Sequence, residues 1–539
     1  MTWLDYSVIS IIALLSTVLM VFVGYKLLQM LQLTGYKMKG YIRWFKETKY
    51  SYLFRLFMLS FLSIASMLIA NVLLADFFIV KVFSYVGIIF YILFASLFIT
   101  NLFTAKQKTP LKYTRRMTRL VSVYSVLVFG LTWLLEYIGV KFIPYLSYAI
   151  VAIVPVLLPC VVFIAYGITY PIEKIISNSF IKKSTKKLYS NQDLKVIGIT
   201  GSYGKTSVKN ILGTILSEKY KVCITPSSYN TPLGISKTIL SKLESTDQVF
   251  IAEMGAKQKN DINELCEMVR PTIGLITGIG NQHLLTFGSI ENIAQTKGEL
   301  AEYITAHEGK LYINTDLELA SKLAEKYPKA IKVSVNSENG ELVAKNIKTT
   351  KDGSVFELYY NNQKIACKTI LLGDHNISNI LLASRVALDL GLTLKEISTG
   401  ISKLITTSHR LEIIKSSSKY TIIDDAYNSS VEGSKASLNV LSKFGGQKIV
   451  ITPGLVELGS EQYKSNFEFG ENMAKICSYV IIDSVINYEA ISSGLKSAGF
   501  DEKRIVQVAN LSQAVEVLNS IAESNDVVLF ENDLPDNYT

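Results

Sequence analysis

Cysteine is scarce in this sequence, and no two of its five cysteines form a Cys-x-x-Cys pair. They are scattered at Cys160, Cys223, Cys266, Cys367 and Cys477. This spacing argues against a structural zinc site or a disulfide framework and is typical of a protein in a reducing compartment. Histidine is scarcer still, with four in 539 residues.

The C-terminal two-thirds of the chain lacks the basic excess that the total net charge of +10 suggests. Residues 1–190 contain 20 Lys and Arg against 5 Asp and Glu, a net charge of +15, so the remainder carries −5. A nucleic-acid-binding protein needs a basic patch on its folded domain. The distribution therefore argues against nucleic acid as a partner and places the basic excess beside the apolar N-terminal segments.

Long apolar runs, which the rest of the chain lacks, dominate its first third. Five stretches are long enough to cross a bilayer, which takes about 20 residues each. They lie at 7–29, 56–75, 82–104, 120–140 and 145–170. The first has neither the basic start nor the small-residue cleavage site of a signal peptide. We therefore predict an α-helical transmembrane domain over residues 1–175, with about five spans.

Basic residues gather in alternate loops between these stretches. Clusters follow the first, third and fifth stretches, around Lys37, Arg115 and Lys182, whereas each of the other two loops holds a single lysine. Because loops rich in Lys and Arg stay in the cytoplasm, the pattern predicts a multi-pass protein of the plasma membrane. Its N-terminus is expected outside and its C-terminal part in the cytoplasm, where ATP is available. Residues 176–193 are interpreted as a basic linker against the anionic headgroups of the lipid bilayer.

After Asp193, short β-branched runs alternate with helical patterns, which is typical of an α/β fold. The expected strands of a first set are 195–200, 221–225, 248–252, 273–277 and 310–314, with helices at 205–219, 261–269 and 291–304. Residues 341–370 predict a small antiparallel sheet. The expected strands of a second set are 420–424, 447–452, 479–483, 504–508 and 526–531. We therefore predict a central ATP-binding domain, 194–405, and a C-terminal Rossmann-like domain, 406–539.

The first motif is a strand that enters a glycine-rich loop and then a helix, VIGITGSYGKTS at 196–207. Backbone N–H groups of such a loop can hold phosphate oxygens. Lys205 is predicted to neutralise the β- and γ-phosphates of ATP, and the Thr206 hydroxyl to reach Mg²⁺. The loop is compact, because Ile199 stands where the usual spacing has a glycine. The residues predicted to bind ATP here are Gly201, Ser202, Gly204, Lys205, Thr206 and Ser207.

Two further strands end in side chains that suit a metal. Glu253 ends the strand in FIAEMGA and is placed to hold the metal that Thr206 coordinates. His283 follows the glycine-rich segment ITGIGNQ. A lone histidine is usually structural, but the position of His283 at the presumed active edge predicts a metal ligand and catalytic residue.

Taken in order, several segments resemble the Mur ligases: GSYGKTS, SSYNTPLGI, EMGA, NQHLLTFGSIENIAQTKGE, GDHNISN, SHRLE, DDAYNSS and TPGLVELG. The resemblance covers roughly residues 194–539 and is greatest to the branch that adds D-alanyl-D-alanine to the peptidoglycan precursor. It implies an ATP-dependent carboxylate–amine ligase that uses two Mg²⁺ ions. The carboxylate is activated as an acyl phosphate, and an amino-acid or dipeptide amine then attacks it.

The resemblance also assigns roles to individual residues. Lys297 matches a lysine that is often carbamylated and then bridges a second Mg²⁺ near His283. Arg410 matches a hinge arginine that reaches phosphate. The residues that match the family's HNxxN segment at the nucleotide site are His375, Asn376 and Asn379. The residues that match contacts to the ATP ribose and to the substrates are Asp425, Asn230, Thr231, Asp424, Tyr427 and Asn428.

The sequence departs from the family pattern in ways that leave the acceptor open. The N-terminal domain that binds the UDP-sugar nucleotide in the family has no match, and the apolar stretches stand in its place. Ser430 and Val431 replace a usual Asn-Pro pair. The acceptor is therefore either UDP-linked or lipid-linked. The alternatives are a poly-γ-glutamate-type synthetase, an ATP-driven membrane transporter and a catalytically silent scaffold, all of which fit the later motifs less well.

Overall fold

A computed structural model describes most of the chain. The described residues are 3–73, 80–104, 109–142, 149–226, 229–280, 287–337, 340–350, 352–414, 419–426, 430–456 and 458–533. The chain divides into two compact units, which we call the helical unit, Met1–Asn178, and the α/β unit, Ser179–Leu534. Each unit is described by itself.

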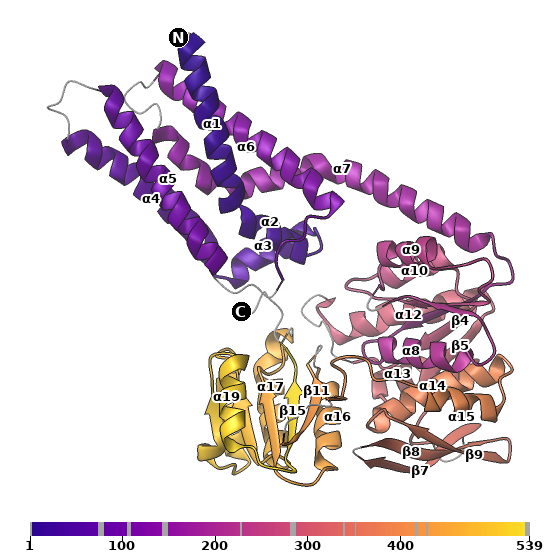
Figure 1. Ribbon diagram of the computed structural model, residues 1–539. Helices are drawn as coiled ribbons and strands as arrows, with labels where there is room; N and C mark the ends of the chain where they lie inside the picture. The colour runs from indigo at the N-terminus through magenta and orange to yellow at the C-terminus, as the bar shows by residue number, and fades with distance from the viewer. Residues whose placement is uncertain are drawn as a thin grey trace. The chain divides into compact units, whose positions relative to one another are not determined.

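The helical unit contains long helices, with the short helices α2 and α3 between α1 and α4 (Figure 1). Its elements are α1 (Trp3–Val23), α2 (Tyr25–Leu33), α3 (Met38–Glu47), α4 (Ser51–Leu73), α5 (Val80–Thr104), α6 (Arg115–Phe142), η2 (Ala149–Ile153) and α7 (Val154–Tyr189). Helix α1 packs along α6, and α4 packs along α5. Gly24 permits close approach of α1 and α6, because a Cβ there would lie 2.2 Å from the hydroxyl oxygen of Tyr124.

Three of the five predicted spans fall on helices long and apolar enough to cross a membrane. These candidate spans are Tyr6–Val23, Arg115–Phe142 and Ile150–Tyr189. Within the described residues, the other two predicted spans correspond to shorter apolar helices, Ser51–Ser66 and Ile89–Phe103. Within the described residues, three of the five predicted spans are therefore supported, and the other two stay predictions. The first also ends at Val23 instead of residue 29, because the chain turns at Gly24 into α2.

The segment 176–193, predicted as a linker, is helical as far as Tyr189, where α7 ends. Its last turns pack within the α/β unit. Leu188 is buried in a hydrophobic cluster there, and the hydroxyls of Ser184 and Ser236 are hydrogen-bonded at 2.9 Å. Sequence reasoning missed the helix because these contacts, rather than apolar periodicity, order the segment.

The α/β unit begins with a six-stranded parallel sheet in the order β2-β3-β1-β4-β5-β6. Its strands are β1 (Lys195–Thr200), β2 (Val222–Ile224), β3 (Val249–Glu253), β4 (Ile273–Ile276), β5 (Lys310–Asn314) and β6 (Ile331–Val333). Five of them lie where the sequence predicts strands, and the three-residue β6 was not predicted. Helix bounds are α8 (Lys205–Leu216), α9 (Pro232–Ser241), α10 (Asp261–Val269), α12 (Ile290–Ala306) and α13 (Glu318–Glu325).

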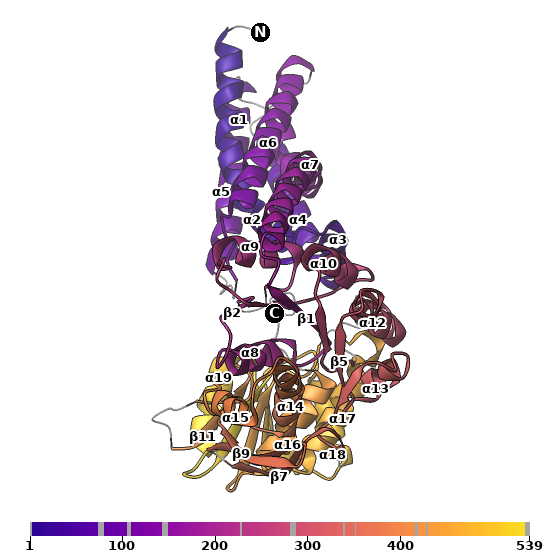
Figure 2. The ribbon, with the colours of Figure 1, turned by 90° about the vertical axis from the view of Figure 1, so that its right-hand side faces the viewer.

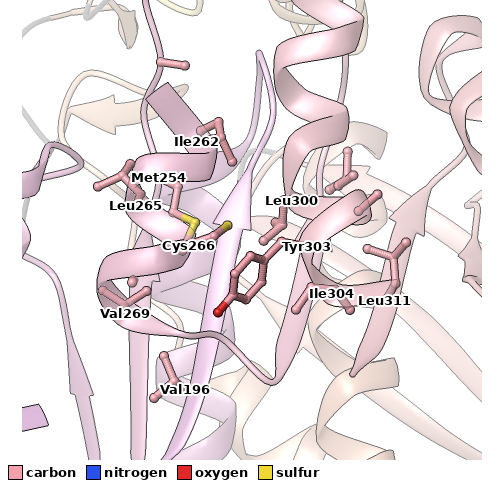
Figure 3. Close-up of a cluster of buried hydrophobic side chains, with 14 of the residues drawn as sticks. Val196, Met254, Ile262, Leu265, Cys266, Val269, Leu300, Tyr303, Ile304 and Leu311 are labelled. Atoms are coloured by element: carbon pink, nitrogen blue, oxygen red, sulfur yellow. The ribbon is translucent and has the colours of Figure 1, made fainter. Parts of the chain in front are cut away.

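The predicted antiparallel sheet is present, with β7 (Leu342–Thr350), β8 (Gly353–Tyr360) and β9 (Gln363–Thr369). Helices α14 (Asp374–Asp389) and α15 (Leu394–Ser402) follow it. Figure 2 shows α10 and α12 on one face of the first sheet and α8 and α14 on the other. Each face has its own hydrophobic core. Figure 3 shows part of the first core, where Met254, Cys266 and Tyr303 pack together.

A second six-stranded sheet follows, in the order β10-β11-β15-β12-β13-β14. Its strands are β10 (Glu412–Ile414), β11 (Thr421–Asp425), β12 (Lys448–Thr452), β13 (Tyr479–Ile482), β14 (Ile505–Gln507) and β15 (Val527–Glu531). Its helices are α16 (Val431–Ser442), η3 (Gly459–Glu461), α17 (Gln462–Ala474), α18 (Tyr488–Ser497), η4 (Glu502–Arg504) and α19 (Leu511–Ile521). All pairings are parallel except that of the edge strand β10, which was not predicted. All five cysteines are free.

Candidate active site

The glycine-rich loop connects β1 to α8 at the carboxyl edge of the first sheet. Gly201 has φ of 150° and lies against Thr277, where a Cβ would be 2.0 Å from the Thr277 Oγ1. Gly204 has φ of 77° and is the N-cap of α8. The loop is fixed to the strand beside it, because the Ser202 N–H donates to the Gly278 carbonyl at 2.6 Å. The backbone N–H groups at the start of α8 thus face a site suited to phosphate.

Lys205, in the first turn of α8, folds back over this loop. Its Nζ donates to the carbonyl oxygens of Gly201 at 2.7 Å and Ser202 at 2.9 Å. Burial lowers the pKa of Lys205 to about 8; the charge of Arg410 lowers it further, and that of Glu253 opposes the shift. A triphosphate bound in the loop would place negative charge beside Lys205 and so favour the protonated form of the lysine.

Glu253 ends β3, is 1% exposed and is the centre of a polar network. Its Oε2 accepts from the Thr206 hydroxyl and from Lys209 Nζ, each at 3.0 Å. Its Oε1 accepts from Asn230 Nδ2 at 3.1 Å. Hydroxyl and carboxylate oxygens suit Mg²⁺, which usually takes one or two protein carboxylates together with substrate phosphates and water. The predicted neighbours Thr206 and Glu253 therefore fit that ion.

The predicted HNxxN residues lie at the start of α14, beside the same loop. Asn379 lies directly against Gly204, because a Cβ on that glycine would be 2.8 Å from Asn379 Oδ1. Asn376 donates through Nδ2 to the Leu372 carbonyl at 2.9 Å. Burial lowers the pKa of His375 to about 4, so its imidazole is neutral near pH 7.

The C-terminal domain contributes Arg410 and an aspartate pair at the end of β11. Asp425 accepts from the Leu411 N–H at 3.2 Å, and burial raises the pKa of Asp425 to about 7, although that bond and the Arg410 charge oppose the rise. Asp424 instead pairs with His409, at 2.7 Å between Oδ2 and Nδ1. The two aspartates therefore face different partners.

These elements enclose a cavity of about 560 Å³, within the size range of small-molecule sites. The predicted residues that line it are Ser202, Gly204, Lys205, Thr206, Ser207, Asn230, Glu253, His375, Asn376, Asn379, Arg410 and Asp425. Four others are not among the lining residues: Gly201, Thr231, Lys297 and Asp424. Thr231 caps α9 instead, where its hydroxyl accepts from the Gly234 N–H at 3.3 Å. His283, Tyr427 and Asn428 lie outside the described residues.

Lys297 lies on α12 and is 4% exposed. Its Nζ is 5.8 Å from the centroid of the Phe287 ring. Burial lowers the pKa of Lys297 to about 7, and the positive charge of Lys205 lowers it further.

Sequence reasoning missed several residues of the cavity region. Lys209 forms a fully buried ion pair with Glu253, and Tyr203 donates to Glu432 at 2.6 Å. Asn314 and Asp316 line the cavity after β5. A usable signal existed for the last two, because polar residues directly after a buried strand of a parallel sheet lie at its ligand-binding edge.

The fold and site are those of a nucleotide-dependent ligase, and comparison with known proteins makes the class specific. Residues 199–387 match the model of the Mur ligase middle domain, and residues 409–531 match that of the Mur ligase, glutamate ligase domain. The chain belongs to the Mur ligase family, whose members are ATP-dependent amide ligases.

The sequence relatives are UDP-N-acetylmuramoyl-tripeptide–D-alanyl-D-alanine ligases. The chain is 30% identical to that of Buchnera aphidicola over 346 residues, covering 61% of this chain and 74% of the relative. It is 28% identical to that of Escherichia coli K12 over 333 residues, covering 61% and 68%. The resemblance stated from the motifs is thereby confirmed.

Solved structures give the same family. MurF of Thermotoga maritima in complex with ADP matches with a TM-score of 0.58 and 25% identity, over 66% of this chain and 80% of that one. MurF of Acinetobacter baumannii matches in fold with a TM-score of 0.60 at 24% identity, over 66% and 77%.

Proposed function

We propose that this protein is a membrane-anchored ligase that uses ATP to join D-alanyl-D-alanine to the carboxylate of a cell-wall precursor. An oxygen of the acceptor carboxylate attacks the γ-phosphorus of ATP and ADP leaves. The dipeptide amine then attacks the acyl carbon, an amide forms, and phosphate and a proton are released. The observation that carries the proposal is the cavity that gathers the phosphate loop, Glu253, the start of α14 and Arg410 around one space.

The protein's own residues hold the reactants and offset negative charge. Lys205 and Arg410 are the cations that line the cavity beside the phosphate loop, and preorganised charges of this kind stabilise a phosphoryl-transfer transition state. Asp425 is assigned to the ATP ribose. Mg²⁺ held by Thr206 and Glu253 would withdraw charge from the phosphates. Lys209 forms an ion pair with Glu253 at 3.0 Å and so holds its carboxylate in place.

Lys297 is proposed to act as a carbamate. Only a neutral amine adds CO₂, and a pKa of about 7 leaves much of the Lys297 amine neutral at neutral pH. Addition forms an N–C bond, releases a proton and replaces a buried cation by an anion. That anion also relieves the repulsion from Lys205. With His283, it is proposed to hold a second Mg²⁺.

The choice of D-alanyl-D-alanine rests on the sequence relatives, whose names give that amine and a UDP-N-acetylmuramoyl tripeptide as substrates. The test is mass spectrometry of the products made by the purified enzyme from ATP, D-alanyl-D-alanine and a panel of carboxylate acceptors. We expect one acceptor to gain the mass of the dipeptide less water, together with one ADP. Joining of a different amine, such as glutamate, would support a poly-γ-glutamate-type synthetase instead.

Membrane anchoring rests on the three candidate spans and on the apolar surface of the helical unit. Ile11, Val126 and Phe163, on α1, α6 and α7, are 59%, 70% and 55% exposed, as side chains facing lipid would be. The basic segments are expected on the cytoplasmic side. Membrane fractionation followed by carbonate extraction is the test. Release of the protein into the soluble fraction would contradict the anchor.

An anchor confines the enzyme to the surface where a lipid-linked acceptor lies, which raises encounter frequency without specific contacts. To test this, kcat/KM of the full-length enzyme in lipid is compared with that of a chain that starts at Ser179. That start keeps Leu188 and Tyr189, which contact the α/β unit. Loss of the preference for the lipid-linked acceptor in the shorter chain is expected. Use of a soluble UDP-linked acceptor by both chains as well as, or better than, the lipid-linked one would contradict the lipid-linked hypothesis.

A further inference from the structure

Glu432 lines the cavity beside the phosphate loop. It lies in the first turn of α16, whose N-terminus favours a negative charge. Its Oε2 accepts from the Tyr203 hydroxyl at 2.6 Å, and Tyr203 directly precedes Gly204 and Lys205. This contact places a carboxylate of the C-terminal domain next to the loop that is assigned to the γ-phosphate.

The other carboxylates that line the cavity already have strong partners. Glu253 pairs with Lys209, and Asp374 pairs with Lys443 at 3.2 Å. Asp316 accepts from the Val335 N–H and the Ser334 hydroxyl. Asp425 accepts from the Leu411 N–H beside Arg410. Among the described residues, Glu432 differs because it has a single partner, the Tyr203 hydroxyl, whereas Asp316 accepts from several groups.

A carboxylate at this place opposes the binding of anionic phosphates unless a cation accompanies it. Lys205 and Arg410 supply charge to the phosphates, so the unmatched charge of Glu432 calls for another cation. The amine substrate brings one, since an unreacted α-amino group is largely protonated near neutral pH. The amine must also reach the acyl phosphate to within bonding approach, about 3–3.5 Å. The loop side of the cavity is where both requirements meet.

We infer that Glu432 is the binding site for the ammonium group of the amine substrate, with the Tyr203 hydroxyl occupying that carboxylate in its absence. This inference rests on the proposed function and names the contact that selects a cationic amine. The ammonium nitrogen replaces the tyrosine hydroxyl as the donor to Glu432. Before attack it loses a proton to solvent, and its lone pair then forms the bond to the acyl carbon.

Two substitutions separate this role from a simple latch between domains. Glu432→Gln keeps an acceptor for Tyr203 but removes the charge, whereas Tyr203→Phe removes the hydrogen bond but keeps the charge. We expect Glu432→Gln to raise KM for the amine by about 10- to 100-fold, as for loss of a charged hydrogen bond, with KM for ATP nearly unchanged. Tyr203→Phe should leave KM for the amine unchanged or lower it, and Glu432→Asp should restore part of the affinity.

The matched control is Glu489→Gln, which changes an exposed carboxylate in the first turn of α18, away from the cavity lining. Steady-state kinetics use the full-length enzyme and vary the amine and ATP separately. An unchanged KM for the amine in Glu432→Gln, or an equal loss in Tyr203→Phe, would overturn the ammonium site. If the native enzyme joins no amine at all, the proposed function fails and this inference falls with it; a native enzyme that prefers another amine leaves the same comparison to be made with that amine.

Discussion

Buried side-chain oxygens of the helical unit and those at the cavity of the α/β unit differ in their hydrogen bonding. In the helical unit, Tyr41, Ser60, Tyr91 and Glu136 have buried side-chain oxygens without a hydrogen-bond partner among the described residues. In the α/β unit, Ser384 Oγ and Arg385 Nε are likewise buried without a partner among the described residues, whereas Glu253 at the cavity is bonded through both oxygens. A buried carboxylate without partners is costly, whereas a satisfied network fixes geometry. The comparison between Glu136 and Glu253 indicates that the cavity, rather than the α/β unit as a whole, holds its buried carboxylate in a fixed geometry.

The largest expected effect comes from the α/β unit's phosphate loop. Lys205→Ala should reduce ligation by at least about 10²- to 10³-fold, because the triphosphate loses its positive partner in a buried site. Amide product is measured by mass spectrometry, and circular dichroism checks that the variant is folded. Full turnover by a folded Lys205→Ala enzyme would remove the phosphate-loop assignment.

Lys297→Ala should come next, with activity reduced by about 10²-fold and partly restored by short carboxylic acids, which replace the carbamate. Depleting bicarbonate should inhibit the native enzyme and leave the rescued variant unaffected. ADP release in buffers with and without added bicarbonate measures both effects. The carbamate hypothesis is wrong if the substitution has no effect or if bicarbonate is irrelevant to the native enzyme.

Substitution of Glu136 in the helical unit tests the contrast between buried carboxylates with and without hydrogen-bond partners. Glu136 is fully buried, and neither of its oxygens has a hydrogen-bond partner among the described residues, so Glu136→Leu should stabilise that unit by about 1–3 kcal/mol. Ligase activity should remain at the native level. Thermal unfolding of the full chain in detergent gives the measurement, with Val126→Leu on the exposed face of α6 as a control. A destabilised Glu136→Leu protein would show that the carboxylate has a partner of its own.

The pH dependence of the α/β unit should carry the signature of His375. Its folded pKa of about 4 lies below its ordinary value of 6.5. The unfolded chain therefore binds more protons between those values, and stability falls as pH drops from 6.5 toward 4. The free energy of unfolding should decline less steeply over this window in His375→Asn. Parallel slopes for the two proteins would show that His375 does not titrate in this way.

The smallest effect is expected at Thr231, which sequence reasoning assigned to substrate. Its observed bond to the Gly234 N–H makes it the N-cap of α9. Thr231→Ala should cost about 1 kcal/mol of stability with kcat/KM unchanged, and Thr231→Ser should restore the loss. Chemical denaturation and steady-state kinetics together decide the matter. A fall in kcat/KM at unchanged stability would return Thr231 to the substrate site.

Local sequence pattern was sufficient to predict five strands of each six-stranded sheet and the phosphate loop. The strand at 195–200 and the start of α8 at Lys205 lie where the sequence predicts them, because β-branched runs and glycine positions act over short distances. The Tyr203–Glu432 contact joins residues 229 positions apart, and the Lys209–Glu253 pair joins helix α8 to strand β3. Such pairs depend on tertiary packing, which one sequence does not encode in any local period.

Local sequence pattern also did not predict where the spans of the helical unit end. Hydropathy located five apolar stretches, but α1 ends at Val23, before the predicted end at residue 29, and Gly24 lies there against Tyr124 of α6. Likewise, the side chains of the basic end of α7 bond to α9 and to carbonyls in the last turn of α10, as in Ser184–Ser236 and Tyr189–Met268. Composition predicted whether each segment is apolar or basic, whereas tertiary packing determines the residue at which each helix ends.

The most direct test of the account measures ADP release by the full-length enzyme in lipid vesicles, with acceptor and D-alanyl-D-alanine added separately and together. The account predicts that sustained ADP release requires both substrates and equals the amide product one for one. Sustained ADP release without the amine, accompanied by movement of a solute across the vesicle membrane, would contradict it and support an ATP-driven transporter.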